Sequence, residues 1–167
     1  MQSLRTYMAM LTLYENNFRI LHWKLAGAEF HKTHERFGDY YDQLGTFMDE
    51  TAEQMITLGE TPVSSRDALS ILQGETGFTA VMIDPALDYS ADAANHAAYH
   101  MFEQLREMAA EFADADDDEL PIEVSDVFMD HARWYRIEGM YKLQRANTTA
   151  TKPNDQPEPA PVNVPDV

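Results

Sequence analysis

Long stretches of this chain repeat apolar residues every three or four positions, which is the spacing of an amphipathic α-helix. Residues 2–24 carry the pattern without a proline, and residues 30–58 repeat it. The small residues 26–28 separate the two stretches, and Gly59, followed by Pro62, closes the second. We therefore expect the chain to begin with two long helices joined by a short turn.

Three more helices are expected further along the chain. A short one is predicted over residues 64–72, and a long one, capped by Ser90 or Asp92, runs to Ala113. A fourth long helix is predicted over 121–146, with its proline in the first turn. Four long helices and a short extra one between the second and third, with no strand pattern of comparable strength, predict an all-α bundle.

Length and charge limit what this bundle can be. The 167 residues contain 29 acidic and 12 basic side chains, a formal net charge of −17, and 44% of them are apolar. This is enough chain for one ordinary domain with a core, which we place at residues 1–146. Because proteins hold nucleic acid mainly through Lys and Arg, the charge argues against DNA binding and favours small cations.

The last residues differ from the rest. Residues 147–167 hold five of the eight prolines, and we interpret them as an acidic, extended tail that would need a partner surface to become ordered. The beginning of the chain shows no export signal, and no run approaches the roughly 20 apolar residues of a membrane span. The sequence thus predicts a cytoplasmic protein.

Candidate metal ligands cluster in the first two predicted helices. The chain has six His and no Cys, so a metal must bind to nitrogen and oxygen. His22 and His34 lie 12 positions apart across the first turn, and Asp49 and Glu53 are spaced to share one helix face. Two imidazoles with two carboxylates suit iron, manganese or zinc.

Helix geometry separates these ligands into two pairs. His34 and Asp49 are 15 positions apart on one predicted helix, a distance of roughly 22 Å at a rise of 1.5 Å per residue. One subunit cannot bring both pairs to one ion. If all four residues are ligands, Asp49 and Glu53 of a second, antiparallel copy must meet His22 and His34 of the first, which gives two equivalent sites per dimer.

The residues around these ligands resemble the signature of the Dps miniferritins, the DNA-binding proteins from starved cells. Order and spacing agree over about 40 residues, and the looser likeness extends over residues 2–146. The residues that carry the resemblance are His22-Trp23-Lys24-Leu25-Ala26-Gly27, Phe30, His34, Phe37, Asp49, Ala52-Glu53 and Leu58-Gly59.

The resemblance implies a ferritin-like four-helix subunit that assembles into a hollow dodecamer. It further implies a di-iron ferroxidase centre between subunits, where ferrous iron is oxidised, preferentially by hydrogen peroxide, and then stored as ferric mineral. The matching ligands are His22 and His34 of one chain with Asp49 and Glu53 of its mate. Trp23 matches an aromatic residue beside the centre that can intercept radicals. Where the family often has another carboxylate, one turn after the second histidine, this chain has Gly38.

Two other interpretations stay open at this point. A single histidine is often a surface or core residue, and two carboxylates four positions apart are often a solvated helix face. The chain could also be a non-catalytic structural or interaction protein that reuses the miniferritin scaffold, with residues 147–167 docking on a partner. Fast iron oxidation by the intact protein distinguishes the ferroxidase from that alternative.

Overall fold

The computed structural model describes residues 3–74, 79–116 and 120–149, with side chains up to residue 145. Most of these residues are helical, and the helical segments agree with the predicted ones to within a few residues. In chain order the segments are α1 (Leu4–Lys24), α2 (Phe30–Thr57), α3 (Ser65–Gly74), α4 (Ala91–Ala113), α5 (Ile122–Trp134), the π-helical η1 (Tyr135–Tyr141) and α6 (Lys142–Thr149).

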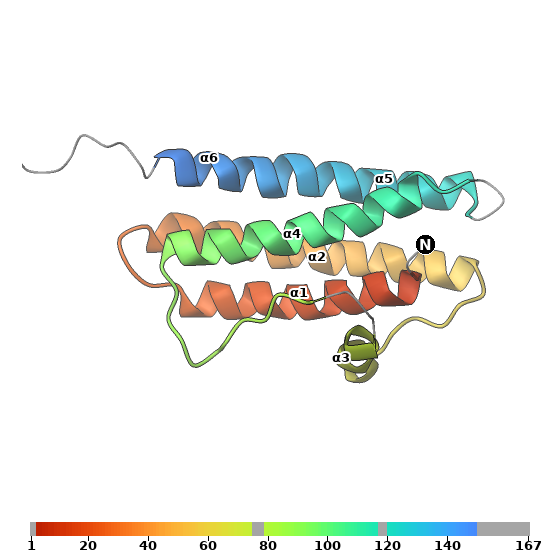
Figure 1. The fold of residues 1–167 in the computed structure, drawn as a ribbon, viewed down its shortest axis with the longest axis horizontal. Coiled ribbons are helices and arrows are strands. Elements are labelled where there is room, and N and C mark those ends of the chain that lie inside the picture. The colour runs from red at the N-terminus through yellow and green to blue at the C-terminus, as the bar shows by residue number, and fades with distance from the viewer. Residues whose placement is uncertain (1–2, 75–78, 117–119, 150–167) are drawn as a thin grey trace, which may run out of the picture.

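The long helices form two antiparallel pairs (Figure 1). One pair is α1 with α2, joined by a short turn at one end of the bundle, and the other is α4 with the α5–η1–α6 rod. The short α3 follows α2 in the chain, and residues 79–90 return along the bundle to the start of α4. Helices α2 and α4 therefore run in the same direction. This is the predicted all-α, ferritin-like bundle with one short extra helix.

Glycine and backbone pairing position the turn between α1 and α2. Gly27 has a φ of 101°, a conformation that residues with a side chain rarely adopt. Just before it, Lys24 and Ala26 exchange backbone hydrogen bonds of 2.8 and 2.9 Å with Tyr89, and Lys24 pairs with Asp88 at 2.7 Å. These contacts fix the end of α1 against the start of α4.

Aromatic side chains fill the centre of the bundle. The ring of Phe18 stacks on that of Phe102 with centroids 4.8 Å apart, and Phe37 and Tyr40 pack against Phe18 from α2. Phe18, Phe37 and Phe102 are fully buried. Each buried phenylalanine stabilises the fold by about 1.5–3 kcal/mol relative to an exposed one. These rings thus hold α1, α2 and α4 together.

Serine caps explain why two of the helices begin where they do. The side chain of Ser3 accepts a hydrogen bond from the backbone N–H of Thr6, and Ser90 accepts one from Ala93, both at 3.2 Å. Each cap satisfies a backbone donor that the helix leaves unpaired, and is worth about 1 kcal/mol. Of the two predicted caps for α4, Ser90 is the one used.

The fourth long helix differs from the prediction in two ways. Pro121 caps α5 instead of lying in its first turn. The expected uninterrupted helix contains the π-helical segment η1, where Gly139 lies against the ring of Phe102. A Cβ atom at Gly139 would lie 2.7 Å from Cδ2 of that ring, so only glycine lets the rod approach α4 this closely. Because Phe102 is 37 positions away from Gly139, the local sequence around Gly139 could not predict this close approach.

The predicted domain boundary falls within the last helix, since α6 ends at Thr149, three residues beyond residue 146. The rest of the predicted tail, residues 150–167, lies outside the described residues. Among the residues that are described, none of the helices combines the length and apolar character needed to cross a bilayer.

Candidate metal centre

His22 and His34 lie against each other at one end of the bundle. His22 is in the last turn of α1 and His34 in the second turn of α2, so the turn at Gly27 brings them together. Their ring centroids are 3.5 Å apart, and both side chains are partly exposed. Phe30 packs beside His34 at 4.9 Å, and Tyr41 meets the ring of His22 edge-on at 5.4 Å. The structure therefore places the two predicted histidines together.

Hydrogen bonding fixes which nitrogen of His22 can bind a metal. Its Nδ1 lies 2.8 Å from the backbone carbonyl oxygen of His34, which can only accept, so Nδ1 carries the proton and donates. In the neutral ring the lone pair is then on Nε2. A second group that orients a histidine in this way is usual at metal sites. The contact leaves Nε2 of His22 as the nitrogen that could bind a metal.

The charge state of His34 also suits a ligand. Desolvation, then the neighbouring His22 and His31, lower the pKa of His34 below its ordinary value of 6.5. The ring is therefore neutral at pH 7, and a neutral imidazole can donate a lone pair to a cation. The lowered pKa of His34 thus favours binding of a metal cation over binding of a proton at this ring.

Asp49 and Glu53 lie far from this pair, as the helix geometry predicts. Helix α2 runs unbroken from Phe30 to Thr57, so 15 residues of helix separate His34 from Asp49, roughly 22 Å. Both carboxylates are exposed. Among the described residues, no group of three or more His, Asp or Glu side chains is arranged to hold a metal ion within one chain. The four predicted ligands thus form two separate pairs in the subunit.

A large exposed apolar side chain accompanies each pair. Trp23, next to His22, is 65% exposed, and Ile56, one turn after Glu53, is 63% exposed. Gly38 faces His22, because a Cβ atom there would lie 3.7 Å from Cε1 of that ring. This position, where the sequence resemblance implies that another carboxylate is common, is therefore directed at His22, but glycine supplies no ligand.

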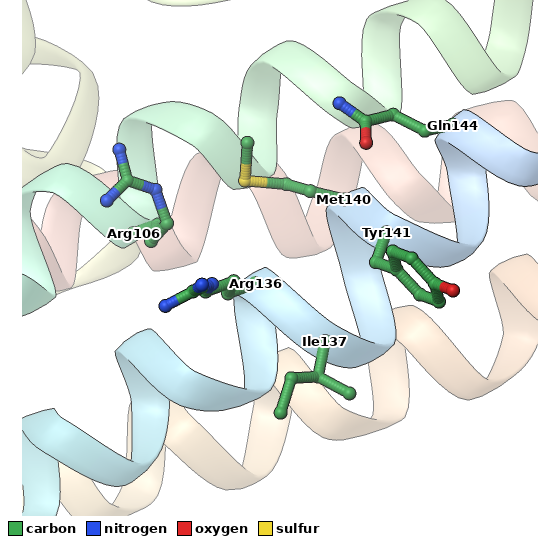
Figure 2. A pocket seen from close by; sticks show the side chains of 6 residues that line it. All are labelled: Arg106, Arg136, Ile137, Met140, Tyr141 and Gln144. Atoms are coloured by element: carbon green, nitrogen blue, oxygen red, sulfur yellow. The ribbon is translucent and has the colours of Figure 1, made fainter.

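A groove of about 600 Å³ lies elsewhere, between α4 and the η1–α6 segment. Arg106 of α4 and Arg136 of η1 approach it from facing helices, and the side chain of Met140 extends from η1 toward α4 (Figure 2). Ile137, Tyr141 and Gln144 complete the lining. Because these residues include no histidine or carboxylate, the groove offers none of the ligands expected for iron.

One set of polar residues in the core could not be predicted from the sequence. His131 carries no metal-site spacing in the sequence. In the structure it contacts Glu50 and Tyr7, which are 81 and 124 positions away. No local pattern could have indicated partners at these separations, because only the folded bundle brings them together.

Comparison with known proteins shows which family the chain belongs to. The ferritin-like domain family matches residues 2–120. A DNA protection during starvation protein of Porphyromonas gingivalis is 40% identical over 55 residues, which are 33% of this chain and 35% of that protein. The protein of the same name from Listeria innocua is 33% identical over 57 residues, 34% and 36% of the two chains. The chain thus matches about a third of the length of these relatives.

The fold likeness extends much further. The solved structure of Dps from Listeria innocua soaked with cobalt superposes with a TM-score of 0.74 at 20% identity, and covers 87% of this chain and 89% of that one. Antigen TpF1 from Treponema pallidum superposes with a TM-score of 0.73 at 22% identity, over 86% and 87% of the two chains. The predicted resemblance to the Dps miniferritins is confirmed.

Proposed function

Because the chain belongs to the ferritin-like domain family, we propose that it is a ferroxidase and iron-storage protein that oxidises ferrous iron at sites shared by two subunits. The observation that carries the proposal is the adjacent pair of imidazoles, in which a backbone hydrogen bond orients the ring of His22 and a lowered pKa keeps the ring of His34 neutral. A histidine pair supplies two ligands, and an iron site needs carboxylates as well. Asp49 and Glu53 of a second, antiparallel copy are the ligands that we assign to complete it.

The surface of the subunit supports a shared site. Trp23 and Ile56 flank the two pairs and would be covered when an antiparallel copy docks. Exposed apolar residues grouped around polar ligands are typical of an interface that is open in the isolated subunit. The two-fold symmetry of such a dimer produces two equivalent sites. A dodecameric shell built from these dimers, in the cytoplasm, is part of the same proposal.

Ferrous iron is the substrate in this proposal. The imidazoles hold ferrous iron while open positions admit the oxidant, and the carboxylates favour the ferric product over the ferrous substrate. With hydrogen peroxide as the oxidant, two ferrous ions supply the two electrons that convert peroxide to water, so hydroxyl radical is not released. The formal charge of −17 attracts ferrous ions to the assembly. The same charge argues against direct DNA binding.

The decisive experiment removes the two carboxylate charges without changing side-chain size. A variant carrying Asp49→Asn and Glu53→Gln should lose rapid ferrous oxidation while native mass measurement shows the same assembly. The matched control carries Glu103→Gln and Glu107→Gln, which removes two carboxylates with the same spacing from α4. The control should oxidise iron at the rate of the unmodified protein.

Unchanged oxidation in the Asp49 and Glu53 variant would refute the site assignment. If the unmodified protein itself oxidises iron no faster than buffer, the ferroxidase proposal fails. The non-catalytic interaction protein then becomes the better explanation, and removing residues 147–167 should abolish binding to its partner.

A further inference from the structure

Four polar side chains form a continuous hydrogen-bonded chain through the core. Nε2 of His131 lies 2.7 Å from a carboxylate oxygen of Glu50, and Nδ1 lies 3.0 Å from the hydroxyl of Tyr7. The hydroxyls of Tyr7 and Tyr135 are 2.9 Å apart. Both tyrosines are fully buried and His131 is 1% exposed. This hydrogen-bonded series joins α1, α2, α5 and η1, and the proposed iron ligands are not part of it.

The chemistry of these groups determines which atom donates the proton in each of these hydrogen bonds. A carboxylate can only accept, so the Nε2–H of His131 donates to Glu50. Burial, which outweighs the opposing effect of Glu50, lowers the pKa of His131 below 6.5, and the ring is neutral at pH 7. Its Nδ1 therefore accepts the hydroxyl proton of Tyr7. Tyr135 in turn donates to the oxygen of Tyr7.

We propose that Tyr7 is a redox-active tyrosine, which gives an electron to a one-electron oxidant while its hydroxyl proton moves to Nδ1 of His131. With hydroxyl radical as the oxidant, the electron converts it to hydroxide, Tyr7 becomes a neutral radical, and His131 becomes an imidazolium. The carboxylate of Glu50, already hydrogen-bonded to this ring, stabilises the new positive charge. This activity goes beyond the proposed iron chemistry and does not need the iron site.

Because Tyr7 is buried, its oxidation requires a neighbouring base to accept the hydroxyl proton. A tyrosine that loses only an electron leaves a cation in a low-dielectric core, which is strongly unfavourable. Transfer of the proton over a 3.0 Å hydrogen bond removes that charge from the phenol. Rings of Phe112 and Phe128 enclose Tyr7 at 5.8 and 5.6 Å, and keep the radical away from water and other proteins.

Tyr14 provides an internal comparison. It lies on α1 two turns after Tyr7 and is also fully buried. Its hydroxyl donates to the side-chain amide oxygen of Gln104. An amide oxygen is an acceptor but not a base at neutral pH, so Tyr14 has nowhere to transfer its proton. Two buried tyrosines of one helix thus differ in the one property that oxidation requires.

An aromatic path connects the buried chain to the surface. Trp134 is partly exposed, and its ring lies 5.8 Å from that of Tyr135 and 5.5 Å from that of Phe47. Phe47 in turn packs against His131 at 4.0 Å. An electron can leave Tyr7 through these neighbouring rings to an oxidant that reacts with Trp134. The expected role is to trap radicals that reach the protein.

The test uses the full-length protein without iron and a photogenerated oxidant, ruthenium(III) tris(bipyridine). Electron paramagnetic resonance after a flash should show a tyrosyl radical that survives added ascorbate, because ascorbate quenches radicals on exposed tyrosines. Tyr7→Phe should lose this protected signal, and Tyr14→Phe, the matched control, should keep it. His131→Gln, whose amide can accept from Tyr7 and donate to Glu50 but is not a base, should also lose it.

A second measurement needs no variant. In the unmodified protein the protected radical should couple to two exchangeable protons, one from Nδ1–H of His131 and one from the hydroxyl of Tyr135, and both couplings should vanish in D₂O. Absence of a protected radical, or its persistence in Tyr7→Phe, would overturn the proposal. A protected signal in His131→Gln equal to that of the unmodified protein would overturn the role of His131 as the base. Since iron is absent throughout, none of these results depends on the proposed ferroxidase.

Discussion

Mixing two inactive variants tests whether the iron site is shared between subunits. One variant lacks the histidines (His22→Ala with His34→Ala), and the other lacks the carboxylates (Asp49→Asn with Glu53→Gln). Helix α2 holds His34 and Asp49 15 residues apart without a break, roughly 22 Å. No rearrangement within one subunit that keeps this helix can close that gap. Each variant alone should therefore have no complete site.

The expected recovery follows from two-fold symmetry. When the two variants are unfolded together in equal amounts and refolded, half of the dimers contain one copy of each. In a mixed dimer one site lacks both kinds of ligand, and the other is complete. About one quarter of the sites, and hence about one quarter of the rate of ferrous oxidation, should return. Tagging one variant and measuring native mass establishes the fraction of mixed dimers.

The controls are each variant refolded alone, which should stay inactive. If the mixture is as inactive as the separate variants although mixed dimers are present, the ligands do not come from two chains and the reasoning fails. If one variant alone retains the full rate, its mutated residues are not ligands.

Further predictions concern stability. Gly139→Ala should lower the free energy of unfolding by about 1–3 kcal/mol, because its Cβ would lie 2.7 Å from the ring of Phe102. In a protein that also carries Phe102→Leu, Gly139→Ala should cost less. If the costs of the two substitutions simply add, the clash between residue 139 and the ring is not the cause. Burial holds the pKa of His131 below 6.5, so the unfolded chain binds its proton at higher pH than the folded one, and stability should decline as pH falls below about 6.5. Urea unfolding at several pH values should show that the free energy of unfolding declines less steeply in His131→Gln than in the unmodified protein. An equal decline in both proteins would mean that groups other than His131 cause the pH dependence.

Much of the fold could be predicted from the sequence because its signals are local. Apolar spacing marks α1 and α2, Gly27 marks the turn, and Ser90 caps α4. The π-helical segment η1 could not be predicted, since it accompanies a contact between Gly139 and Phe102 in a different helix. Local sequence patterns describe one element at a time and contain no information about which ring will face it.

Part of the candidate site could likewise be predicted from the sequence, and part could not. His22 and His34 could be paired from the sequence because a short turn separates them, and the distance to Asp49 followed from helix rise alone. The hydrogen bond that selects Nε2 of His22 depends on the backbone of His34 and could be seen only in the structure. The hydrogen bond between Tyr7 and His131 could not be predicted either, because the two residues come from opposite ends of the sequence and meet only in the folded bundle.

We propose that this protein binds ferrous iron at sites shared by two subunits and oxidises it there. The most direct test is an anaerobic ferrous titration of the full-length protein, followed by hydrogen peroxide, with absorbance, native mass and a spin trap for hydroxyl radical read together. We expect saturable ferrous binding to an oligomer, a rapid rise in ferric absorbance on adding peroxide, and no trapped hydroxyl radical. A monomer that binds no iron, or oxidation at the rate of iron and peroxide in buffer, would contradict the account.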